Sequence, residues 1–463
     1  MDPIERVLEA VDLAADQVDA SDGARASHAQ DVGTREAEAV EPDVVVYPET
    51  TGDVATVLRA ASEAGVPVTP FAAGTSLEGN PVPVEGGISL DMRRMDAVLD
   101  VRPEAFQLDV EPGVMGPGIE EALAPHGLFF PPLPSSGDIS TIGGMVANDA
   151  SGMQTVKYGE VRDWVLGLEV ILADGTVITT GGRAAKSSCG YNLTELFVGS
   201  EGTLGVITRV TLEAAPRPEQ IRGGRVRFEH LDDATAAVAD LVQSGVDLAK
   251  VELMDEQSAT IANAYLGTDL PDEPMVFLEF HAEHHVEAEI DFARTVLADH
   301  APTAIEIGDE TDMDELWRAR RELAFAMFAY DPDLEPLHPG DVTVPIDRYA
   351  EAIAHIKGLA DAHDFLIPCF GHGGDGNVHY AVMVDPSDEA RLAEAEAVSD
   401  AIVAYAIDVG GTATGEHGVG RGKQAYLLAE HGPDAVATMR AIKDALDPAG
   451  ILNPGKIFPP DQS

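Results

Sequence analysis

The chain has 463 residues, 45% of them hydrophobic, which is long enough for two or three domains with substantial cores. It carries 81 acidic against 29 basic residues, a formal net charge of −52, and no basic patch that could neutralise phosphates, so nucleic acid is excluded as a partner. Because concentrated salt screens such self-repulsion, the composition predicts a protein from an extreme halophile, such as a haloarchaeon.

No targeting or membrane segment is evident in the sequence. The first residues, MDPIERVLEA, are acidic and helical in pattern, unlike a signal peptide, and no apolar run approaches the roughly 18 residues that span a bilayer. We expect a cytoplasmic protein with at most a peripheral contact at the inner face of the membrane. The cysteines, Cys189 and Cys369, make no disulfide framework or iron–sulfur ligand set, and both are expected to be small buried thiols.

The first part of the chain predicts an N-terminal segment followed by an α/β unit. Residues 1–40 are expected to be a helical segment that turns polar and weakly ordered from about residue 21. Residues 44–47 and 66–69 read as strands on either side of a helix that ends at Gly65. Further on, Asp174–Gly175 between two β-rich runs predicts a hairpin.

The pattern changes after the proline-rich residues 216–220, which predict a domain boundary. Beyond it, two strand–helix–strand runs predict a βαββαβ unit. The later elements are a helix over 313–328, a strand over 342–344, a helix over 350–362, and strands over 365–370 and 378–384.

Two segments carry metal-ligating side chains. GHGGDGNVH at residues 371–379 holds His372 and His379, and TGEHGVGRGK at residues 414–423 holds Glu416 and His417. Two histidines and one glutamate form a three-ligand set for Zn²⁺ or a similar ion, which leaves His417 as a candidate base. A zinc hydrolase or a non-haem iron site could use the same ligands. HAEHH at residues 281–285 is interpreted instead as a polar strand end that enters a helix.

Four loops rich in Gly, Ser and Thr lie within the first half of the chain. They are PFAAGTSLEGN at residues 70–80, SSGDISTIGG at 135–144, ANDASG at 147–152 and SEGTLGVI at 200–207. Small residues let backbone N–H groups approach phosphate oxygens, so the set favours a phosphate-containing cofactor. Because no G-x-G-x-x-G follows a first strand, a Rossmann domain is not expected.

These loops also carry a family resemblance. Together with LFVGSEGTLGVIT, CFGHGGDGNVHY and LDPAGILNPGKIF, the chain resembles the vanillyl-alcohol-oxidase type (PCMH-type) flavoproteins. Within them it is similar to the family of FAD-dependent D-lactate dehydrogenases (cytochrome type) and glycolate oxidase D subunits. The resemblance implies an α+β fold: a PCMH-type FAD-binding domain over residues 41–217, then an FAD-linked oxidase C-terminal domain over residues 218–459. The latter is expected to have a mainly antiparallel sheet covered by helices, and its last segment to return to the FAD domain.

The resemblance implies that FAD lies on the loops, noncovalently, because the first loop has no His or Cys for attachment. The implied FAD-binding residues are Pro70, Phe71, Ala72, Ala73, Gly74, Thr75, Ser76, Ser135, Ser136, Thr141, Gly144, Ala147, Asn148, Ser151, Glu201, Gly202, Gly205, Val206, Ile207 and Asn453.

The resemblance also assigns roles at the substrate. The positions of His372, His379 and Glu416 would hold the metal, zinc or alternatively manganese or iron, which would bind the 2-hydroxyl and carboxylate of a 2-hydroxy acid. His417 would remove the hydroxyl proton while the C2 hydride passes to flavin N5. LWRARRELAFAM contains the family's W-x-x-R helix, in which Arg320 would clamp the substrate carboxylate and the neighbouring Trp317 would line the site.

Three departures from 2-hydroxyglutarate dehydrogenases favour a small monoacid such as D-lactate. Ala324 and Ala381 stand where those enzymes carry Thr and Asn, and no Lys lies at residues 338–341. The alternatives are a glycolate or broad D-2-hydroxyacid dehydrogenase, and a flavin-binding subunit without its own turnover. The electron acceptor is expected to be a quinone, a cytochrome, an electron-transfer flavoprotein or oxygen, and a homodimer is a further expectation.

Overall fold

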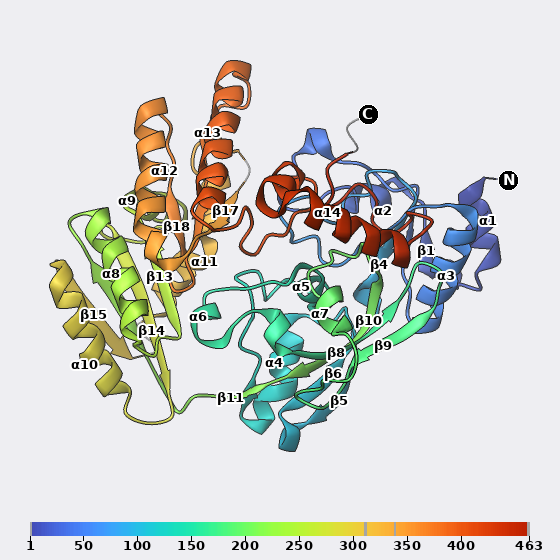
Figure 1. Ribbon diagram of the computed structural model, residues 1–463, viewed down its shortest axis with the longest axis horizontal. Helices are drawn as coiled ribbons and strands as arrows, with labels where there is room; N and C mark the ends of the chain where they lie inside the picture. The colour runs from blue at the N-terminus through green and yellow to red at the C-terminus, as the bar shows by residue number, and fades with distance from the viewer. Residues whose placement is uncertain (1, 310–312, 338, 461–463) are drawn as a thin grey trace. The chain divides into compact units, whose positions relative to one another are not determined.

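The computed structural model describes residues 2–309, 313–337 and 339–460 and divides into two compact units (Figure 1). Unit 1 comprises Met1–Ser151, Glu160–Arg217 and Glu416–Ser463, and unit 2 comprises Gly152–Gly159 and Pro218–Gly415. The chain therefore leaves unit 1 at the boundary near residue 217 and rejoins it at Glu416.

Unit 1 begins with a small, mostly parallel sheet. Its strands run in the order β1 (Val18–Asp19), β2 (Val44–Val46), β4 (Ile88–Asp91) and β3 (Val68–Phe71), with β2 and β3 both parallel to β4. Helix α3 (Thr51–Ala64) connects β2 to β3 and ends at Gly65, whose φ of 66° forms a left-handed cap. The predicted strand, helix and strand are confirmed, and α1 (Pro3–Ala10) packs on α3.

The expectation of a weakly ordered stretch from residue 21 is wrong. Helix α2 (Asp22–Ser27) forms there, and the polar side chains of His28 and Asp31 are only 1% and 4% exposed. His28 Nε2 lies 3.0 Å from Asp91 Oδ2, and Asp31 accepts hydrogen bonds from Ser76 Oγ and the Gly79 N–H. The stretch is ordered because these buried polar groups are paired within unit 1.

A second, antiparallel sheet completes the core of unit 1. Its order is β5 (Val98–Arg102), β6 (Gln107–Val110), β10 (Val206–Glu213), β8 (Val165–Ile171) and β9 (Val177–Gly181), and β8 and β9 form the predicted hairpin, with Gly175 at a φ of 78°. The other elements of unit 1 are α4 (Gly116–Leu123), β7 (Leu128–Phe129), α5 (Ile142–Asn148), α7 (Leu193–Phe197), β11 (Ala215–Pro216) and α14 (Leu427–Leu446).

Unit 2 is built on one seven-stranded antiparallel sheet. Its order is β15 (Ala304–Asp309), β12 (Gln220–Arg227), β14 (Met275–Ala282), β13 (Lys250–Met254), β18 (Cys369–His372), β19 (Asn377–Tyr380) and β17 (Gly340–Thr343). The expected βαββαβ unit is confirmed, with α8 (Leu231–Ser244) and α10 (Val286–Leu297) as its helices. Helix α9 (Glu256–Leu266), which follows β13, was not expected from the sequence.

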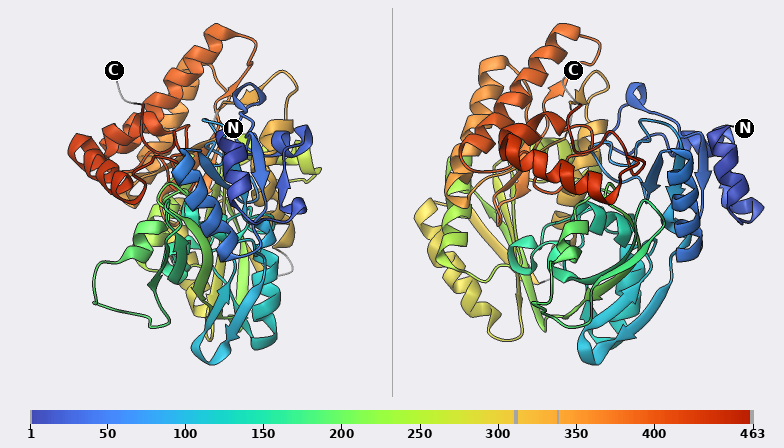
Figure 2. Two further views of the ribbon diagram at one scale, coloured as in Figure 1. Left: turned by 90° about the vertical axis from the view of Figure 1, so that its right-hand side faces the viewer. Right: turned by 45° about the vertical axis from the view of Figure 1, so that its right-hand side comes forward.

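Helices cover both faces of this sheet (Figures 1 and 2). Helices α8 and α10 pack on one face, with α8 also contacting α12 (Tyr349–His363). On the other face α9 and α11 (Asp314–Ala329) share a core with Met254 and Phe277. The remaining elements of unit 2 are α6 (Thr155–Tyr158), β16 (Glu335–Pro336), β20 (Met383–Val384) and α13 (Glu389–Asp408).

Two predicted strands of unit 2 have different bounds. The strand expected over 365–370 begins only at Cys369, and the one expected over 378–384 is interrupted between Tyr380 and Met383. The interruption arises because β20 pairs with β16 instead of continuing the main sheet. Among the described residues, none of the helices combines the length and apolar character needed to cross a bilayer.

Candidate active site

A row of polar side chains crosses the face of the unit 2 sheet that α11 covers. Strand register places Glu252 directly opposite His372, and His379 opposite both Phe370 and Asp341. Because side chains alternate along a strand, these residues share the face of Met254, which packs against α11. Four adjacent strands thus bring two imidazoles and two carboxylates together.

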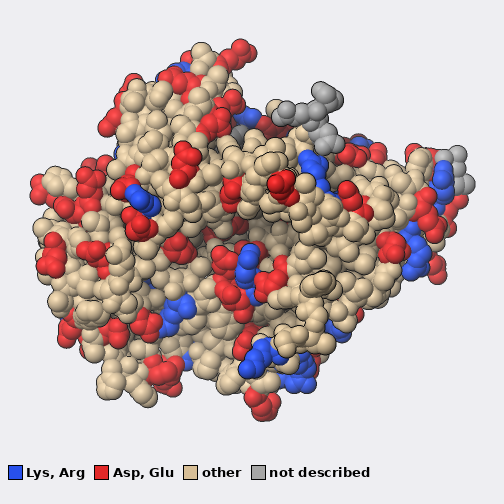
Figure 3. All heavy atoms as spheres, in the orientation of Figure 1, with Lys and Arg blue, Asp and Glu red and all other residues tan. Residues whose placement is uncertain are grey.

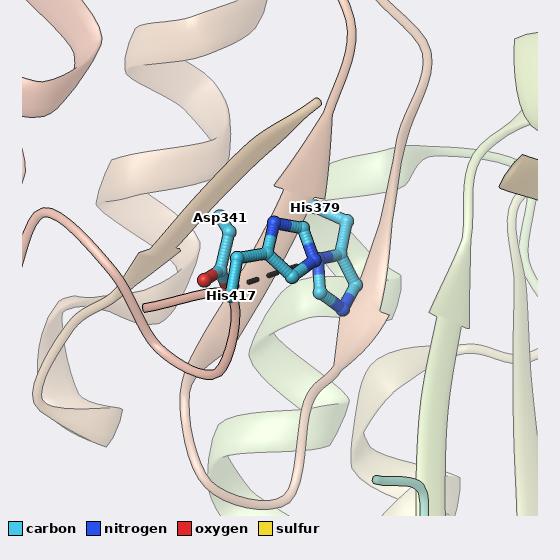
Figure 4. Close-up of side chains that lie close together, drawn as sticks. All are labelled: Asp341, His379 and His417. Carbon is cyan, nitrogen blue, oxygen red and sulfur yellow. Dashed lines mark ion pairs between the residues drawn. The ribbon is translucent and has the colours of Figure 1, made fainter. Parts of the chain in front are cut away.

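The two predicted metal-ligating histidines of unit 2 are neighbours. The ring centroids of His372 and His379 are 5.1 Å apart, the planes are nearly perpendicular, and both side chains are buried. His379 Nδ1 lies 3.8 Å from Asp341 Oδ1, as the dashed line in Figure 4 marks. Asp341 also accepts hydrogen bonds from Asn377 Nδ2 at 2.6 Å and Thr414 Oγ1 at 3.1 Å. Two imidazoles with an adjacent carboxylate are a donor set that suits Zn²⁺ and related ions.

Arg320 reaches the same row from α11. Unlike its exposed neighbours Arg318 and Arg321, it is 3% exposed, and its Nε donates to Glu252 Oε2 at 2.6 Å. Its guanidinium lies 4.8 Å from the centroid of the Phe370 ring. Within the described part of the chain, no group accepts a hydrogen bond from its buried Nη2. A buried cationic donor without a protein acceptor is suited to an anionic ligand.

Trp317, three residues before Arg320, lies on the same side of α11 and is 4% exposed. Its ring packs edge-on against Phe277 with centroids 6.0 Å apart, and Lys250 Nζ lies 4.5 Å from its centroid. Trp317 is therefore part of the apolar core beneath Arg320, and whether it also touches substrate stays a prediction.

In unit 1 the predicted FAD loops come together. Thr75 Oγ1 lies 2.9 Å from Ser140 Oγ, which donates to Ser136 Oγ at 3.0 Å. A Cβ atom added at Gly144 would lie 3.2 Å from Ala72 Cβ, and one added at Gly202 would lie 3.0 Å from the Pro70 ring, so these glycines allow close approach of the loops. The clustered hydroxyls fit a ligand with phosphate oxygens.

The remaining predicted FAD residues take varied positions. Ser135 is exposed, and the Phe71 ring packs against that of His28 at a tilt of 52° with centroids 4.3 Å apart. Gly205, Val206 and Ile207 are buried in or beside β10. Ala73 and Gly74 are half-buried in the first loop, whereas Thr141 is the buried N-cap of α5 and Ala147 lies half-buried within α5. Residues 142–148 therefore form a helix and not the loops that the sequence predicts. The role of each toward FAD stays a prediction.

Several predicted FAD residues contact the segment that begins at Glu416, within unit 1. Ser151 Oγ donates to Glu416 Oε2 at 2.9 Å, and Asn148 Nδ2 donates to the Glu416 carbonyl at 2.9 Å. The carboxylate of Glu201 accepts the N–H groups of Val419 and Gly420 at 2.7 and 2.9 Å. Glu201 has a φ of 52° and is 7% exposed, and burial raises its pKa.

The hydrogen bonds around Glu201 also include the side chains of Asn80 and Asn453. Asn80 Nδ2 donates to Glu201 Oε2 at 2.7 Å, and Asn453 Nδ2 donates to the carbonyls of Asn80 and Glu201. His417 Nδ1 lies 3.8 Å from Glu78 Oε1, and Lys423 Nζ lies 3.4 Å from the same oxygen. The flavin loops and the segment carrying Glu416 and His417 thus form one hydrogen-bonded assembly in unit 1.

Some predictions are corrected, and some functional candidates were missed. Cys189 is exposed rather than buried, because its loop lies outside the core, whereas Cys369 is buried and burial raises its pKa to about 12. His281, at the end of β14, bonds to Glu279.

The residue 338–341 region, where the sequence has no Lys, begins at a position that lies outside the described residues. Glu252 and Asp341 were not identified as functional, although a Glu between Val251 and Leu253 in an apolar strand is a detectable signal.

The comparisons with known proteins cover both units. Residues 217–457 match the family model "FAD linked oxidases, C-terminal domain", and residues 42–181 match the model "FAD binding domain". The chain is 38% identical to mitochondrial D-lactate dehydrogenase [cytochrome] of Arabidopsis thaliana, with 90% of this chain and 74% of that one covered. It is 36% identical to glycolate oxidase subunit GlcD of Bacillus subtilis, with 91% and 90% covered.

Solved structures share the fold at low identity. A 4-ethylphenol oxidase from Gulosibacter chungangensis superposes with a TM-score of 0.79 at 20% identity, over 99% of this chain and 97% of that one. A p-cresol methylhydroxylase gives a TM-score of 0.79 at 17% identity, over 98% and 96%. Both confirm the expected PCMH-type architecture. With its matched domains and the mainly antiparallel sheets seen here, the chain belongs to the FAD-linked oxidase family and is an FAD-dependent oxidoreductase.

Proposed function

We propose that the protein oxidises D-lactate, or a closely related small D-2-hydroxy acid, to the 2-oxo acid. The observation that carries the proposal is the buried Arg320, whose Nη2 has no acceptor among the described residues and which lies on the sheet face that holds His372 and His379. A guanidinium next to two potential metal ligands suits an α-hydroxy carboxylate, which offers a carboxylate and a hydroxyl on adjacent carbons. Relatives named D-lactate dehydrogenase and glycolate oxidase subunit support this substrate class.

A divalent metal ion, zinc or alternatively manganese or iron, is proposed to be held by His372, His379 and Glu416. The two imidazoles lie side by side in unit 2. Thr414 and Gly415, which immediately precede Glu416, bond to Asp341 of the same sheet, so the chain continues to Glu416 from a fixed point next to His379. Such an ion lowers the pKa of a bound hydroxyl.

His417 is proposed to take the proton of the substrate hydroxyl, and Arg320 to orient the carboxylate. When bound, FAD supplies the acceptor for the hydride that leaves C2. The loops with Thr75, Ser136 and Ser140 are proposed to hold it noncovalently, because the residue 70–80 loop offers no His or Cys for a covalent bond.

The substrate is proposed to be small. Ala324 follows Arg320 by one helical turn on the same side of α11, and its methyl group offers no hydrogen bond to a second carboxylate. Ala381, next to β19, is fully buried and equally apolar. A D-2-hydroxy acid with a distal carboxylate would therefore lack partners at these two positions. Glycolate or a broader range of D-2-hydroxy acids is the second candidate, supported by the glycolate oxidase relatives.

Electrons must then pass to a second acceptor. A quinone, a cytochrome or an electron-transfer flavoprotein is proposed, and the word "cytochrome" in the names of several relatives favours a cytochrome. A cytoplasmic location with a peripheral contact at the inner membrane face, and a homodimeric state, are proposed from the sequence alone.

The test is a panel of acids under anaerobic steady-state conditions with an artificial electron acceptor. Purified protein in high salt is assayed with D-lactate, L-lactate, glycolate and D-2-hydroxyglutarate. The highest kcat/KM is expected for D-lactate. A higher value for glycolate or D-2-hydroxyglutarate would replace the substrate and keep the mechanism, whereas turnover of none of them would favour a flavin-binding subunit.

A further inference from the structure

Glu252 is a fully buried carboxylate that touches two parts of the candidate site at once. It lies on β13 between the apolar residues Val251 and Leu253, with an exposure of 0%. One oxygen lies 2.6 Å from His372 Nδ1, and the other accepts a hydrogen bond from Arg320 Nε at 2.6 Å. A carboxylate is costly to bury, so its retention in an apolar strand requires both partners.

We propose that Glu252 is a positioning residue that fixes the His372 imidazole and the Arg320 guanidinium together, and so couples metal binding to carboxylate binding. This inference rests on the proposed function, in which His372 holds the metal and Arg320 holds the substrate. Neither role is assigned to Glu252 itself.

The orientation of His372 follows from sheet register. Glu252 and His372 are directly paired residues of β13 and β18, so their side chains emerge side by side on one face. The short contact is satisfied when Nδ1 carries the proton and donates to the carboxylate. Nε2 is then the nitrogen that would serve as the metal ligand in the proposed function, and the carboxylate raises its basicity.

The orientation of Arg320 follows from two contacts. Glu252 engages Nε, on the inner edge of the guanidinium, and the Phe370 ring lies against the guanidinium at 4.8 Å from its centroid. Both the plane and the rotation of the group are thereby fixed, and Nη2 is left at the far end as the donor for a substrate carboxylate. Phe370 lies two residues before His372 on β18, so the same strand supports both groups.

The variants that test this are E252Q and E252D, with E279Q as the matched control. Gln keeps the size of Glu but presents only one acceptor oxygen to two donors. Glu279 is also a buried carboxylate of this sheet, bonded to an imidazole and an ammonium group, those of His281 and Lys250, neither of which is assigned to metal or hydride chemistry. Zinc affinity is measured by competition with a chelating indicator, independently of turnover, and KM is measured for D-lactate.

E252Q is expected to bind zinc about 10- to 100-fold more weakly and to raise KM at least about tenfold, since outer carboxylates of metal-bound histidines contribute on that scale. E252D should recover part of both losses, and E279Q should keep the zinc affinity of the natural protein. E252Q with unchanged zinc affinity, or with unchanged KM, would overturn the coupling.

If E252Q does not fold, the double variant E252Q/R320M removes both charges of the buried pair and relieves the unpaired cation. Its zinc affinity is expected to be well below that of R320M, and equal affinities would overturn the His372 part of the inference. A natural protein that binds no divalent ion would instead contradict the metal site of the proposed function. The Arg320 part would then be decided by KM in E252Q or, where that variant does not fold, by KM in E252D.

Discussion

His417 is held next to a buried carboxylate in unit 1, with Nδ1 3.8 Å from Glu78 Oε1. We predict that His417→Asn lowers the rate constant of flavin reduction by D-lactate by about 10²- to 10⁴-fold, the usual contribution of a general base, while FAD is retained. Stopped-flow absorbance at the flavin band measures the rate. His284→Asn, an exposed histidine outside the site, is the control. Equal rates in the His417 variant and the natural protein would show that the base lies elsewhere.

Lys456 is a buried cation near the end of the chain. It is 3% exposed, and its Nζ donates to the Val82 carbonyl and to Asn453 Oδ1. Burial and, to a smaller extent, the nearby Arg421 lower its pKa to about 7, against the opposing effect of Glu201. Between pH 7 and the ordinary value of 10.5, the unfolded chain keeps a proton that the folded chain has released. Stability from this group therefore rises with pH in that window.

We predict that Lys456→Met abolishes this rise. Thermal unfolding between pH 7 and 9 should show a Tm that increases by several degrees more in the natural protein than in the variant. Parallel pH profiles for the two proteins would show that Lys456 does not change its protonation on unfolding in this range.

At the scale of elements, the segment between α2 and β2 supports the loop proposed to bind FAD. Asp31 accepts hydrogen bonds from Ser76 Oγ at 2.7 Å and the Gly79 N–H at 2.9 Å, and burial raises its pKa. Both of these donors bind Oδ2, and Thr34 Oγ1 donates to Oδ1 at 2.6 Å. Asp31→Asn removes the charge of the acceptor and leaves an amide NH₂ group facing a donor in either orientation of the side chain. We predict roughly tenfold weaker FAD binding, the scale of one hydrogen bond to a charged acceptor.

Fluorescence titration of apoprotein with FAD measures this effect. Asp53→Asn is the control. Asp53 also accepts backbone N–H groups in unit 1, but it does so at the start of α3, which is not part of the proposed FAD loops. If Asp31→Asn binds FAD as tightly as the control does, the N-terminal segment does not support the cofactor loop.

Some secondary-structure elements could be predicted from the sequence, and others could not. The β2–α3–β3 unit and the βαββαβ helices were predictable because apolar periodicity and the stop at Gly65 are local signals. Helix α9 was missed because it follows β13 almost directly. The ordered residues 21–42 were missed because their stability comes from distant partners such as Asp91.

The residues of the candidate site also divide into those that the sequence predicts and those that it does not. His372, His379 and Arg320 stand in recognisable motifs. The structure places the two histidines on one face of the unit 2 sheet and Arg320 on α11, which covers that face. Glu252 was not predicted because its meaning depends on its register with β18, which is 120 residues away in sequence. A Glu in an apolar strand is a local signal, but strand register between such distant segments is set by tertiary packing, so the sequence does not show which residues it faces.

At the scale of the whole molecule, the net charge of −52 dominates. Asp and Glu side chains are scattered over the face shown in Figure 3, with fewer Lys and Arg among them. Because mutual repulsion weakens the folded state at low ionic strength, we predict that Tm rises by roughly 10 °C or more between 0.1 and 2 M KCl.

Sucrose at matched water activity is the control, since it stabilises by exclusion from the surface without screening charge. A Tm that is independent of KCl, or one that sucrose raises equally, would contradict the halophilic interpretation of the composition.

The most direct test of the central claim, D-2-hydroxy acid oxidation at this site, is the anaerobic visible spectrum of the purified protein after a single addition of D-lactate. We predict that the flavin band bleaches within the mixing time of a manual experiment and that the same concentration of L-lactate leaves it unchanged. Chelator-treated protein should bleach far more slowly and recover with added Zn²⁺. Equal bleaching by both enantiomers, or a flavin band that no D-2-hydroxy acid reduces, would contradict the account.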